Sequence, residues 1–128
     1  MDVDRIDHLV LYVEDIEATS EFYARAVGAE PKPLENGART LQVGDARINL
    51  HPAGDEYDPH AENPAVGAGD VCLITQRPIQ AVQTHLAAEG IQIIEGPVER
   101  AGALGTMTSV YIRDPDGNLV EVATYPDR

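Results

Sequence analysis

The 128-residue sequence contains one cysteine, Cys72, and one lysine, Lys32. A single cysteine excludes an internal disulfide framework. Cys72 lies in the apolar run Val71–Ile74, where a free thiol usually behaves as a small buried hydrophobe. The sequence lacks the roughly 18 consecutive apolar residues of a membrane helix, and its first residues lack the basic-then-apolar order of a secretion signal. We therefore expect a cytoplasmic protein with a buried cysteine.

Basic charge is also scarce. Nine basic residues stand against 22 acidic ones, which gives a formal net charge of -13. Nucleic-acid binding needs clustered lysine and arginine, so we expect neither a nucleic-acid nor a membrane partner. The acidic residues are dispersed along the chain, a pattern typical of halophilic-type proteins from a high-salt cytosol, where short screening lengths weaken self-repulsion.

The first half of the chain is predicted to fold as strand, helix and three strands. Period-two alternation predicts a strand over Ile6–Val13. Apolar positions at helical spacing predict a helix over Ile16–Val27, with Asp15 as its N-cap and Gly28 at its C-terminal end. Further strands, separated by turn residues, are predicted over Ala29–Leu34, Arg39–Val43 and Arg47–His51.

The same order of elements is predicted again in the second half. It comprises a strand over Asp70–Thr75, a helix over Pro78–Ala88 ending near Gly90, a strand over Ile91–Glu95, a glycine-rich loop over Gly96–Gly105, and strands over Met107–Arg113 and Leu119–Thr124 around a turn at 114–118.

This repeat indicates an α+β fold. We expect a single domain over residues 1–128, built from two tandem βαβββ units at about 5–51 and 69–125, with a Pro/Gly-rich connector over 52–68. Each unit would form a curved mixed sheet with its helix on one face. A cavity between paired units is the implied site.

Strand parity groups several polar side chains on the sheet faces opposite the helices. In the strand Ile6–Val13, His8 alternates with the helix-facing residues and shares a face with Tyr12. In the strand Arg47–His51, Asn49 and His51 share a face. Glu121 is the only ionisable residue in an apolar strand. A carboxylate in such a place is costly unless a metal ion, a cation or a proton compensates it.

Three segments together resemble a known superfamily. They are Ile6–Leu11, the Phe22-Tyr23 helix ending at Val27-Gly28, and Arg113–Glu121. The chain resembles the vicinal oxygen chelate superfamily, which includes glyoxalase I, extradiol dioxygenases, fosfomycin-resistance thiol transferases, methylmalonyl-CoA epimerases and bleomycin-binding proteins. Further segments are most similar to glyoxalase-domain proteins related to a bacterial virulence-associated protein, namely Ile48–Gly54, Gly96–Val98 and Gly102–Gly105.

The resemblance implies the glyoxalase/bleomycin-resistance/dihydroxybiphenyl dioxygenase fold and a divalent metal ion, which could be Zn, Ni, Mn, Co or Fe. His8, His51 and Glu121 would be metal ligands. Several superfamily members have a histidine where this chain has Asp70, which follows Gly69 and can ligate through oxygen. Without Asp70, two histidines and one carboxylate leave open coordination positions that also suit non-haem Fe(II).

The resemblance further implies a glyoxalase I-like lyase or isomerase that acts on a small oxygenated substrate through a metal-stabilised enediolate. Glu121, with Asp70 as the possible second carboxylate, would move the proton. Candidate substrate contacts are Tyr12, Asn49, Tyr111 and Arg113.

Other classes remain open at this stage. The alternatives are an Fe(II) ring-cleaving dioxygenase, a thiol transferase, which the scarcity of lysine disfavours, and a non-catalytic binding protein for a bleomycin-type drug. His60 and His85 are expected to be surface residues. A homodimer is expected, with metal ligands from one chain or from both.

Overall fold

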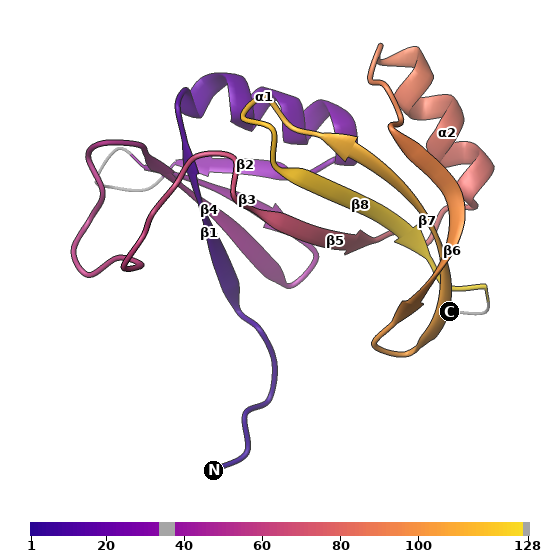
Figure 1. Ribbon diagram of the computed structural model, residues 1–128, viewed down its shortest axis with the longest axis horizontal. Coiled ribbons are helices and arrows are strands. Elements are labelled where there is room, and N and C mark those ends of the chain that lie inside the picture. Colours follow the sequence, from indigo (N-terminus) through magenta and orange to yellow (C-terminus); the bar gives the residue numbers. More distant parts are fainter. Residues whose placement is uncertain (34–37, 127–128) are drawn as a thin grey trace. The chain divides into compact units, whose positions relative to one another are not determined.

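Each half of the chain forms its own four-stranded sheet (Figure 1). The computed structural model describes residues 1–33 and 38–126. Contacts divide the chain into a first unit, Met1–Ala68, and a second unit, Gly69–Arg128. Each unit has the element order βαβββ, so the predicted α+β class and the repeat are confirmed.

The first unit contains one helix and four strands. They are β1 (His8–Val13), α1 (Ile16–Val27), β2 (Glu30–Pro33), β3 (Arg39–Val43) and β4 (Ala46–Pro52). The sheet order is β1-β4-β3-β2. The β1 strand runs parallel to β4, and the other neighbours are antiparallel. The predicted end of β2 at Leu34 lies outside the described residues.

Helix α1 begins and ends as the sequence predicts. The Asp15 carboxylate accepts a hydrogen bond from the Ala18 N–H at 3.0 Å, which satisfies one of the free donors of the first turn. Gly28 ends the helix in the left-handed conformation at φ 71°. The buried helix face, centred on Phe22 and Tyr23, packs over the sheet. The sheet residues buried in this core include Leu11, Val13, Leu41, Ile48 and Leu50.

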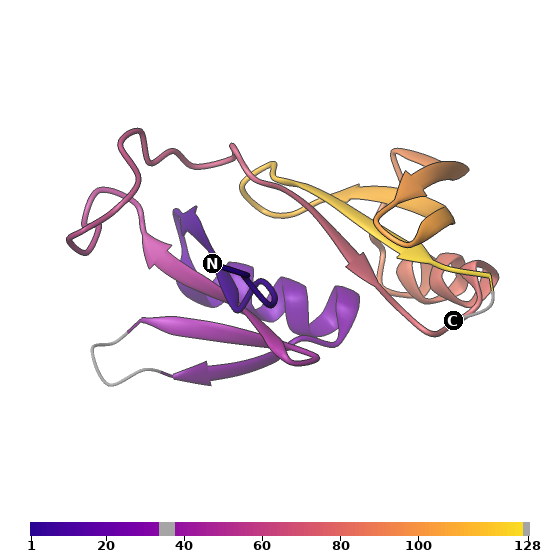
Figure 2. The same cartoon turned by 90° about the horizontal axis from the view of Figure 1, so that it is seen from below.

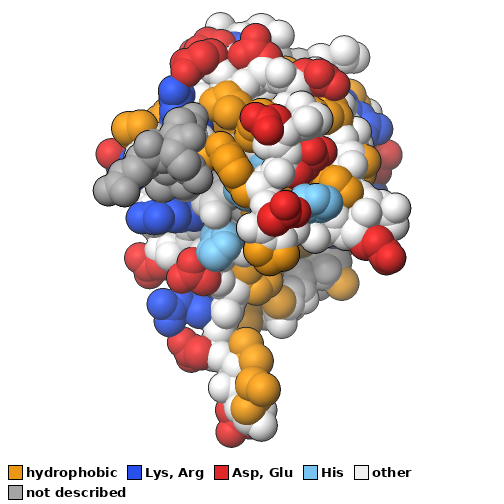
Figure 3. All heavy atoms as spheres, turned by 90° about the vertical axis from the view of Figure 1, so that its left-hand side faces the viewer, with side chains coloured by type: hydrophobic (Ala, Val, Ile, Leu, Met, Phe, Trp, Pro, Cys, Tyr) orange, Lys and Arg blue, Asp and Glu red, His pale blue; other side chains and the backbone are white. Residues whose placement is uncertain are grey.

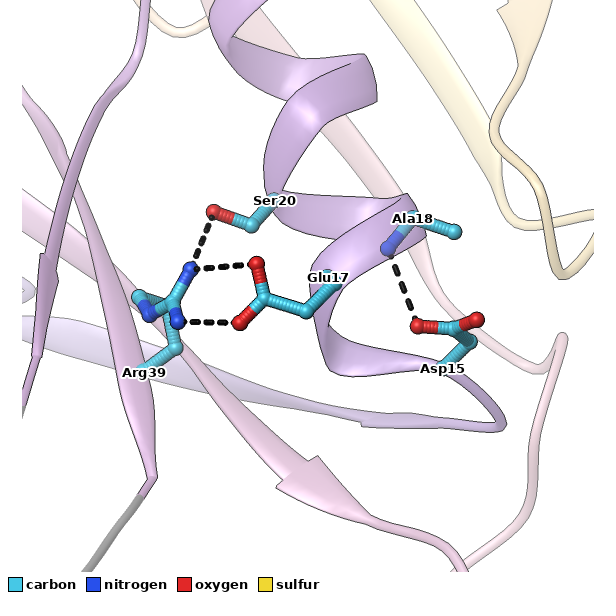
Figure 4. A network of polar contacts seen from close by, with 5 residues as sticks. All are labelled: Asp15, Glu17, Ala18, Ser20 and Arg39. Carbon is cyan, nitrogen blue, oxygen red and sulfur yellow. Dashed lines mark hydrogen bonds and ion pairs between the residues drawn. The ribbon is translucent and has the colours of Figure 1, made fainter.

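A polar network also ties α1 to β3 (Figure 4). The Arg39 guanidinium pairs with both carboxylate oxygens of Glu17 and donates a 3.2 Å hydrogen bond to the Ser20 hydroxyl. The Arg39 side chain is 23% exposed, whereas that of Glu17 is 77% exposed, so solvent screens much of the attraction.

Replacing Arg39 with alanine is expected to lower the free energy of unfolding by about 1 kcal/mol. The bidentate ion pair with Glu17 and the packing of the Arg39 side chain are lost, but Glu17 is well hydrated, which limits the loss. Arg39→Lys keeps the charge but cannot form a bidentate pair, and it should lower the free energy of unfolding by about half as much. Urea denaturation measures both. Arg5→Ala is the matched control, since Arg5 pairs with the exposed Asp4 next to it in sequence. An equal loss in the control would contradict this role for Arg39.

The second unit repeats the arrangement. Its elements are β5 (Asp70–Ile74), α2 (Ile79–Ala88), β6 (Glu95–Gly102), β7 (Gly105–Arg113) and β8 (Leu119–Thr124). The sheet order is β5-β8-β7-β6, with β5 parallel to β8 (Figure 2). Helix α2 contacts β7 and β8 through Ile79, Val82 and Leu86, opposite the buried sheet residues Val110, Ile112, Val120 and Val122.

The predicted position of β6 is wrong. The strand spans Glu95–Gly102, not Ile91–Glu95, so most of the predicted glycine-rich loop is strand. Its residues pair with β7 from Glu95 to Gly102 with a register shift before Val98, and an edge strand tolerates proline and glycine at such irregularities. At Gly102 a Cβ atom would lie 2.3 Å from the Tyr125 hydroxyl oxygen, so this glycine permits Tyr125, which follows β8, to approach the end of β6 closely.

Other boundaries differ by one or two residues. The β1 strand begins at His8, two residues later than predicted, and Ile6 is 77% exposed. Pro78 is the N-cap of α2 instead of its first helical residue, as its extended backbone shows. Such shifts are common at element ends, where few contacts fix the backbone.

On the face of the molecule drawn in Figure 3, the acidic residues do not gather in one patch. Figure 3 shows acidic side chains scattered over one face of the molecule among hydrophobic and uncharged groups. Over residues 1–33 and 38–126, no helix combines the length and apolar character that a membrane crossing requires.

Candidate functional site

The second unit carries a row of reactive side chains across its four strands. The strand register places Cys72, Glu121, Tyr111 and Glu95 in directly paired positions. Residues paired in this way project from the same sheet face. Val120 and Val122 of β8 are buried on the face that α2 covers. Because side chains alternate along a strand, Glu121 and the row of paired residues lie on the opposite face.

Glu121 is oriented by a neighbour on this face. The Ser109 hydroxyl donates a 2.5 Å hydrogen bond to Glu121 Oε2, and Ser109 is fully buried. Cys72 and Tyr111 occupy the paired positions on either side of Glu121. Sequence reasoning missed Ser109, although it has the same strand parity as Tyr111. The carboxylate is thus oriented by a donor from β7.

Cys72 is exposed, which corrects the expectation of a buried thiol. The β5 strand is an edge strand, and Cys72 lies on its open face beside Glu121. Partial burial and the neighbouring Glu121 charge raise the pKa of the Cys72 thiol to about 11. The thiol therefore stays protonated near neutral pH, where it is a donor and not a nucleophile.

Tyr111 is linked to the ion pair between Arg100 and Glu95. Arg100 Nε donates to the Tyr111 hydroxyl oxygen at 3.1 Å, and Arg100 Nη2 lies 2.5 Å from Glu95 Oε2. Desolvation raises the pKa of Tyr111, and the Arg100 hydrogen bond opposes that rise. Sequence reasoning missed Arg100 because it was assigned to a loop. The hydrogen-bond network links Glu95, Arg100 and Tyr111, and Tyr111 pairs with Glu121 in the sheet register.

The other two candidates of the second unit lie nearby on the same face. Asp70 is exposed at the start of β5, where it pairs with Leu119, two positions from the Cys72–Glu121 pair. Arg113 pairs with the other side of Leu119, but its guanidinium donates a 3.2 Å hydrogen bond to the Gly117 carbonyl oxygen. Arg113 therefore contributes to the β7–β8 turn, whereas Asp70 is an exposed residue.

His8 is exposed at the start of β1 and is oriented by its neighbour. His8 Nδ1 lies 2.9 Å from Asp7 Oδ1. An ionised carboxylate can only accept, so Nδ1 carries the proton and the lone pair of neutral His8 is on Nε2. The hydrogen bond from His8 lowers the pKa of Asp7. A carboxylate that fixes a histidine tautomer in this way is a common companion of metal-ligating histidines.

His51 shares the sheet face of His8 but lies at the other end of the strand pair. The register pairs His51 with Tyr12 and pairs His8 with Arg47. At the usual rise per residue, four positions correspond to about 13 Å along the strand. Strand parity predicts a shared face and carries no information about this offset.

Two tyrosines enclose the His51 ring. The ring centroids of Tyr12 and Tyr57 lie 6.0 and 5.0 Å from that of His51, both in edge-to-face geometry. Burial, and secondarily the charge of His8, lower the pKa of His51, which favours a neutral ring. Tyr57 belongs to the connector over 52–68. Two other connector residues contact Tyr12: the Ala61 N–H donates a hydrogen bond to the Tyr12 hydroxyl oxygen, and Val66 forms a β-bridge with Tyr12. The connector thus covers this end of β1 and β4.

Two buried polar atoms on β4 lack partners. Asn49 Oδ1 and His51 Nδ1 have no hydrogen-bond partner among the described residues. The two residues are separated by one position and share a sheet face. Leaving a buried polar atom unpaired costs about 1–3 kcal/mol.

In residues 1–33 and 38–126, no group of three or more His, Cys, Asp or Glu side chains has an arrangement that could hold a metal ion. The predicted ligands are instead distributed: His8 and His51 belong to the first unit, and Asp70 and Glu121 to the second. His60 is exposed in the connector, and His85 lies partly buried in α2.

These features agree with a family match. Residues 5–122 match the model of the Glyoxalase/Bleomycin resistance protein/Dioxygenase superfamily, and the chain belongs to that superfamily. The chain is 46% identical to virulence protein STM3117 of Salmonella typhimurium over 98% of this chain and 87% of that protein. The crystal structure of STM3117 superposes with a TM-score of 0.95 and covers 98% of this chain and 99% of that chain. The predicted superfamily is thereby confirmed.

Other relatives extend the comparison. The glyoxalase domain-containing protein RDO1 of Mycosarcoma maydis is 41% identical over 99% of this chain and 72% of that protein. More distantly, the chain is 26% identical to lactoylglutathione lyase from Agrobacterium tumefaciens, with a TM-score of 0.74 over 96% of this chain and 95% of that one. It is also 26% identical to the metallothiol transferase FosB of Shouchella clausii, over 95% of this chain and 81% of that protein.

Proposed function

We propose that this protein is a divalent-metal-dependent lyase or isomerase of the glyoxalase I type, acting on a small oxygenated substrate. The observation that carries the proposal is Glu121, a partly buried carboxylate whose Oε2 is held by the buried Ser109 hydroxyl. A carboxylate oriented so firmly on an open sheet face can keep one oxygen for a ligand or a proton. Relatedness to a lactoylglutathione lyase and to a metallothiol transferase supports a metal.

The donor types fit a divalent ion. His8 would supply Nε2, because Asp7 holds its other ring nitrogen, and Glu121 would supply Oε1, because Ser109 holds Oε2. Asp70 would add an oxygen donor. Imidazole and carboxylate together suit Zn, Ni, Co, Mn and Fe, so the donor set leaves the metal open. We propose that a homodimer is the functional form, with metal ligands from one chain or from both.

A bound divalent ion would polarise a substrate carbonyl and lower the pKa of the adjacent C–H. The protein's own residues supply the remainder of the chemistry. With Oε1 assigned to the metal, Glu121 would use the second lone pair of Oε2 to take a proton from one substrate carbon and return it to the next, with Asp70 as the possible second carboxylate. Tyr111, whose hydroxyl oxygen accepts from Arg100, would donate its one O–H to a substrate oxygen.

The proposal is tested by loading purified protein with each of these metals in turn and following thioester formation from methylglyoxal hemithioacetals of several thiols. Turnover with at least one metal is expected, and His8→Ala should abolish both stoichiometric metal binding and turnover. His85→Ala, in α2, is the matched histidine control and should change neither. A metal-loaded protein that turns over none of these substrates would refute the lyase, and metal content unaffected by His8→Ala would refute the site.

A further inference from the structure

We infer that Arg100 is a positioning residue, which together with Glu95 directs the hydroxyl proton of Tyr111 away from β6. On its other side Tyr111 pairs with Glu121 of β8, so the proton is available to a substrate held beside that carboxylate. This inference rests on the proposed function, in which Tyr111 donates to a substrate oxygen. It adds the two residues on which the direction of that donation depends.

A register shift in β6 brings Arg100 to the same sheet face as Tyr111. Glu95 pairs with Tyr111, Arg100 pairs with Met107, and the register shifts between Glu95 and Val98. Glu95 and Arg100 are five positions apart, an odd number that would place them on opposite faces of a regular strand. Tyr111 and Met107 are four positions apart on β7 and share a face. The shift therefore resets the alternation of β6 and puts both Glu95 and Arg100 on the Tyr111 face.

Gly96 makes this shift possible. Its φ is 108°, and a Cβ atom there would lie 2.5 Å from the Ser109 carbonyl oxygen and 3.0 Å from Val110 Cα. Both atoms belong to the backbone of the neighbouring strand and cannot move aside, so the position requires glycine. Irregularities of this kind are common beside active sites, where they redirect a side chain. In β6 the side chain redirected is that of Arg100.

Each of the three guanidinium nitrogens of Arg100 has a partner. Nε donates to the Tyr111 hydroxyl oxygen at 3.1 Å, Nη1 to the Glu99 carbonyl oxygen at 3.0 Å, and Nη2 to Glu95 Oε2 at 2.5 Å. The guanidinium carbon also lies 5.6 Å from the centre of the Tyr111 ring. The ion pair alone would contribute little, because the Arg100 and Glu95 side chains are 41% and 56% exposed. The three hydrogen bonds and the ring contact together fix the direction from which the Nε–H approaches Tyr111.

This arrangement decides where the Tyr111 hydroxyl can donate. The Nε–H of Arg100 donates to the phenol oxygen, so the single O–H of Tyr111 must point elsewhere. Two carboxylates flank Tyr111 in the register, Glu95 on β6 and Glu121 on β8. Arg100 occupies Glu95 Oε2 with a charge-assisted bond and so competes with the phenol for that carboxylate. The O–H is thereby kept for the side of Glu121, where the substrate would lie.

NMR on metal-free protein tests the inference, with ¹³C at the Cζ atom of the five tyrosines. The Cζ shift responds to the hydrogen bonds of the hydroxyl, and Tyr111→Phe assigns the Tyr111 signal. Arg100→Met removes the three hydrogen bonds and is expected to shift that signal. Arg25→Met is the matched control and should not, since Arg25 likewise pairs with a glutamate, Glu21, and lies over an aromatic ring, Phe22. A Tyr111 signal left unchanged by Arg100→Met would overturn the inference.

Kinetics of the metal-loaded enzyme separate positioning from structure. Arg100→Met should lower kcat about tenfold or more and change KM less than about twofold, because a directed donor matters most in the transition state. Arg100→Lys keeps a charged donor without the planar fork and should lose less. In a Tyr111→Phe background, Arg100→Met should have no further effect on kcat, since Arg100 acts through Tyr111. An undiminished loss in that background would show a structural role and overturn the inference.

The metal content of Arg100→Met distinguishes this inference from the proposed function. Unchanged metal stoichiometry is expected, because the partners of Arg100 are not proposed ligands. Loss of the metal would make Arg100 a support of the metal site and overturn its assignment to Tyr111. Failure of hemithioacetal turnover by the parental protein would refute the lyase and leave the NMR result on metal-free protein intact, so the two hypotheses fail separately.

Discussion

Replacing Glu121 with glutamine is expected to weaken divalent-metal binding about 100-fold or more, which corresponds to about 2.7 kcal/mol. The amide keeps the shape of the side chain and can still accept from Ser109. It loses the negative charge and the anionic oxygen that a divalent ion favours. Competition against a chromophoric chelator at fixed pH and ionic strength measures the change.

Two further variants test whether the effect is specific to Glu121. Ser109→Ala removes only the hydroxyl that orients Glu121. It should weaken metal binding less, by about tenfold, as is typical when a residue that hydrogen-bonds to a metal ligand is removed. Glu95→Gln is the control, since Glu95 lies in the same row but is paired with Arg100. Parental affinity in Glu121→Gln, or a larger effect of Glu95→Gln, would remove Glu121 from the metal site.

Replacing Asp114 with alanine is expected to lower the free energy of unfolding by about 3–4 kcal/mol. The Asp114 carboxylate accepts from the backbone N–H of Asp116, the backbone N–H of Asn118 and the Asn118 side-chain amide, at 2.9, 3.0 and 2.8 Å. Asp114 and Asn118 are only 5% and 2% exposed, so water cannot readily replace these bonds. Calorimetry or urea denaturation measures the loss.

The conservative variant tests the cause. Asp114→Asn keeps an oxygen for the two backbone donors but faces the Asn118 amide with a second amide, so it should lose about half as much stability. Asp45→Ala, at the exposed turn between β3 and β4, should change stability by less than about 0.5 kcal/mol. Equal losses at the two turns would contradict the role of the buried network.

This network also affects the candidate site. Asn118 Oδ1 accepts a 2.7 Å hydrogen bond from the Gly69 N–H, which fixes the residue before Asp70. We therefore place the Asp114–Asn118 turn among the structural parts of the superfamily motif. Its carboxylate is occupied by the turn itself, whereas Glu121, at the other end of the motif, bears the chemistry we propose.

Most of the fold follows from local sequence signals. Asp15 and Gly28 mark the ends of α1, and alternation marks β3, because in both cases the determining contacts are near in sequence. The β6 strand was misplaced because its glycines and proline signal a loop locally. Its strand conformation comes from pairing with β7, which local propensity does not encode.

The candidate site was predictable in part and for a similar reason. Parity correctly places His8, His51 and Glu121 on sheet faces opposite the helices, since side chains alternate along any strand. The offset between His8 and His51 depends on which residues pair across β1 and β4. The orientation of Glu121 by Ser109 likewise depends on the register of β7 and β8.

The division at residue 68 has an evolutionary consequence. Asn49, His51 and Tyr57 belong to residues 1–68, whereas Ser109 and Glu121 belong to residues 69–128. Each hydrogen-bonded group described above lies within one half of the chain. A crossover between related genes at this boundary would replace His8 and Asp7 together and would keep Glu121 with Ser109. Because each of these pairs lies in one half of the chain, such an exchange would break none of the hydrogen bonds described above.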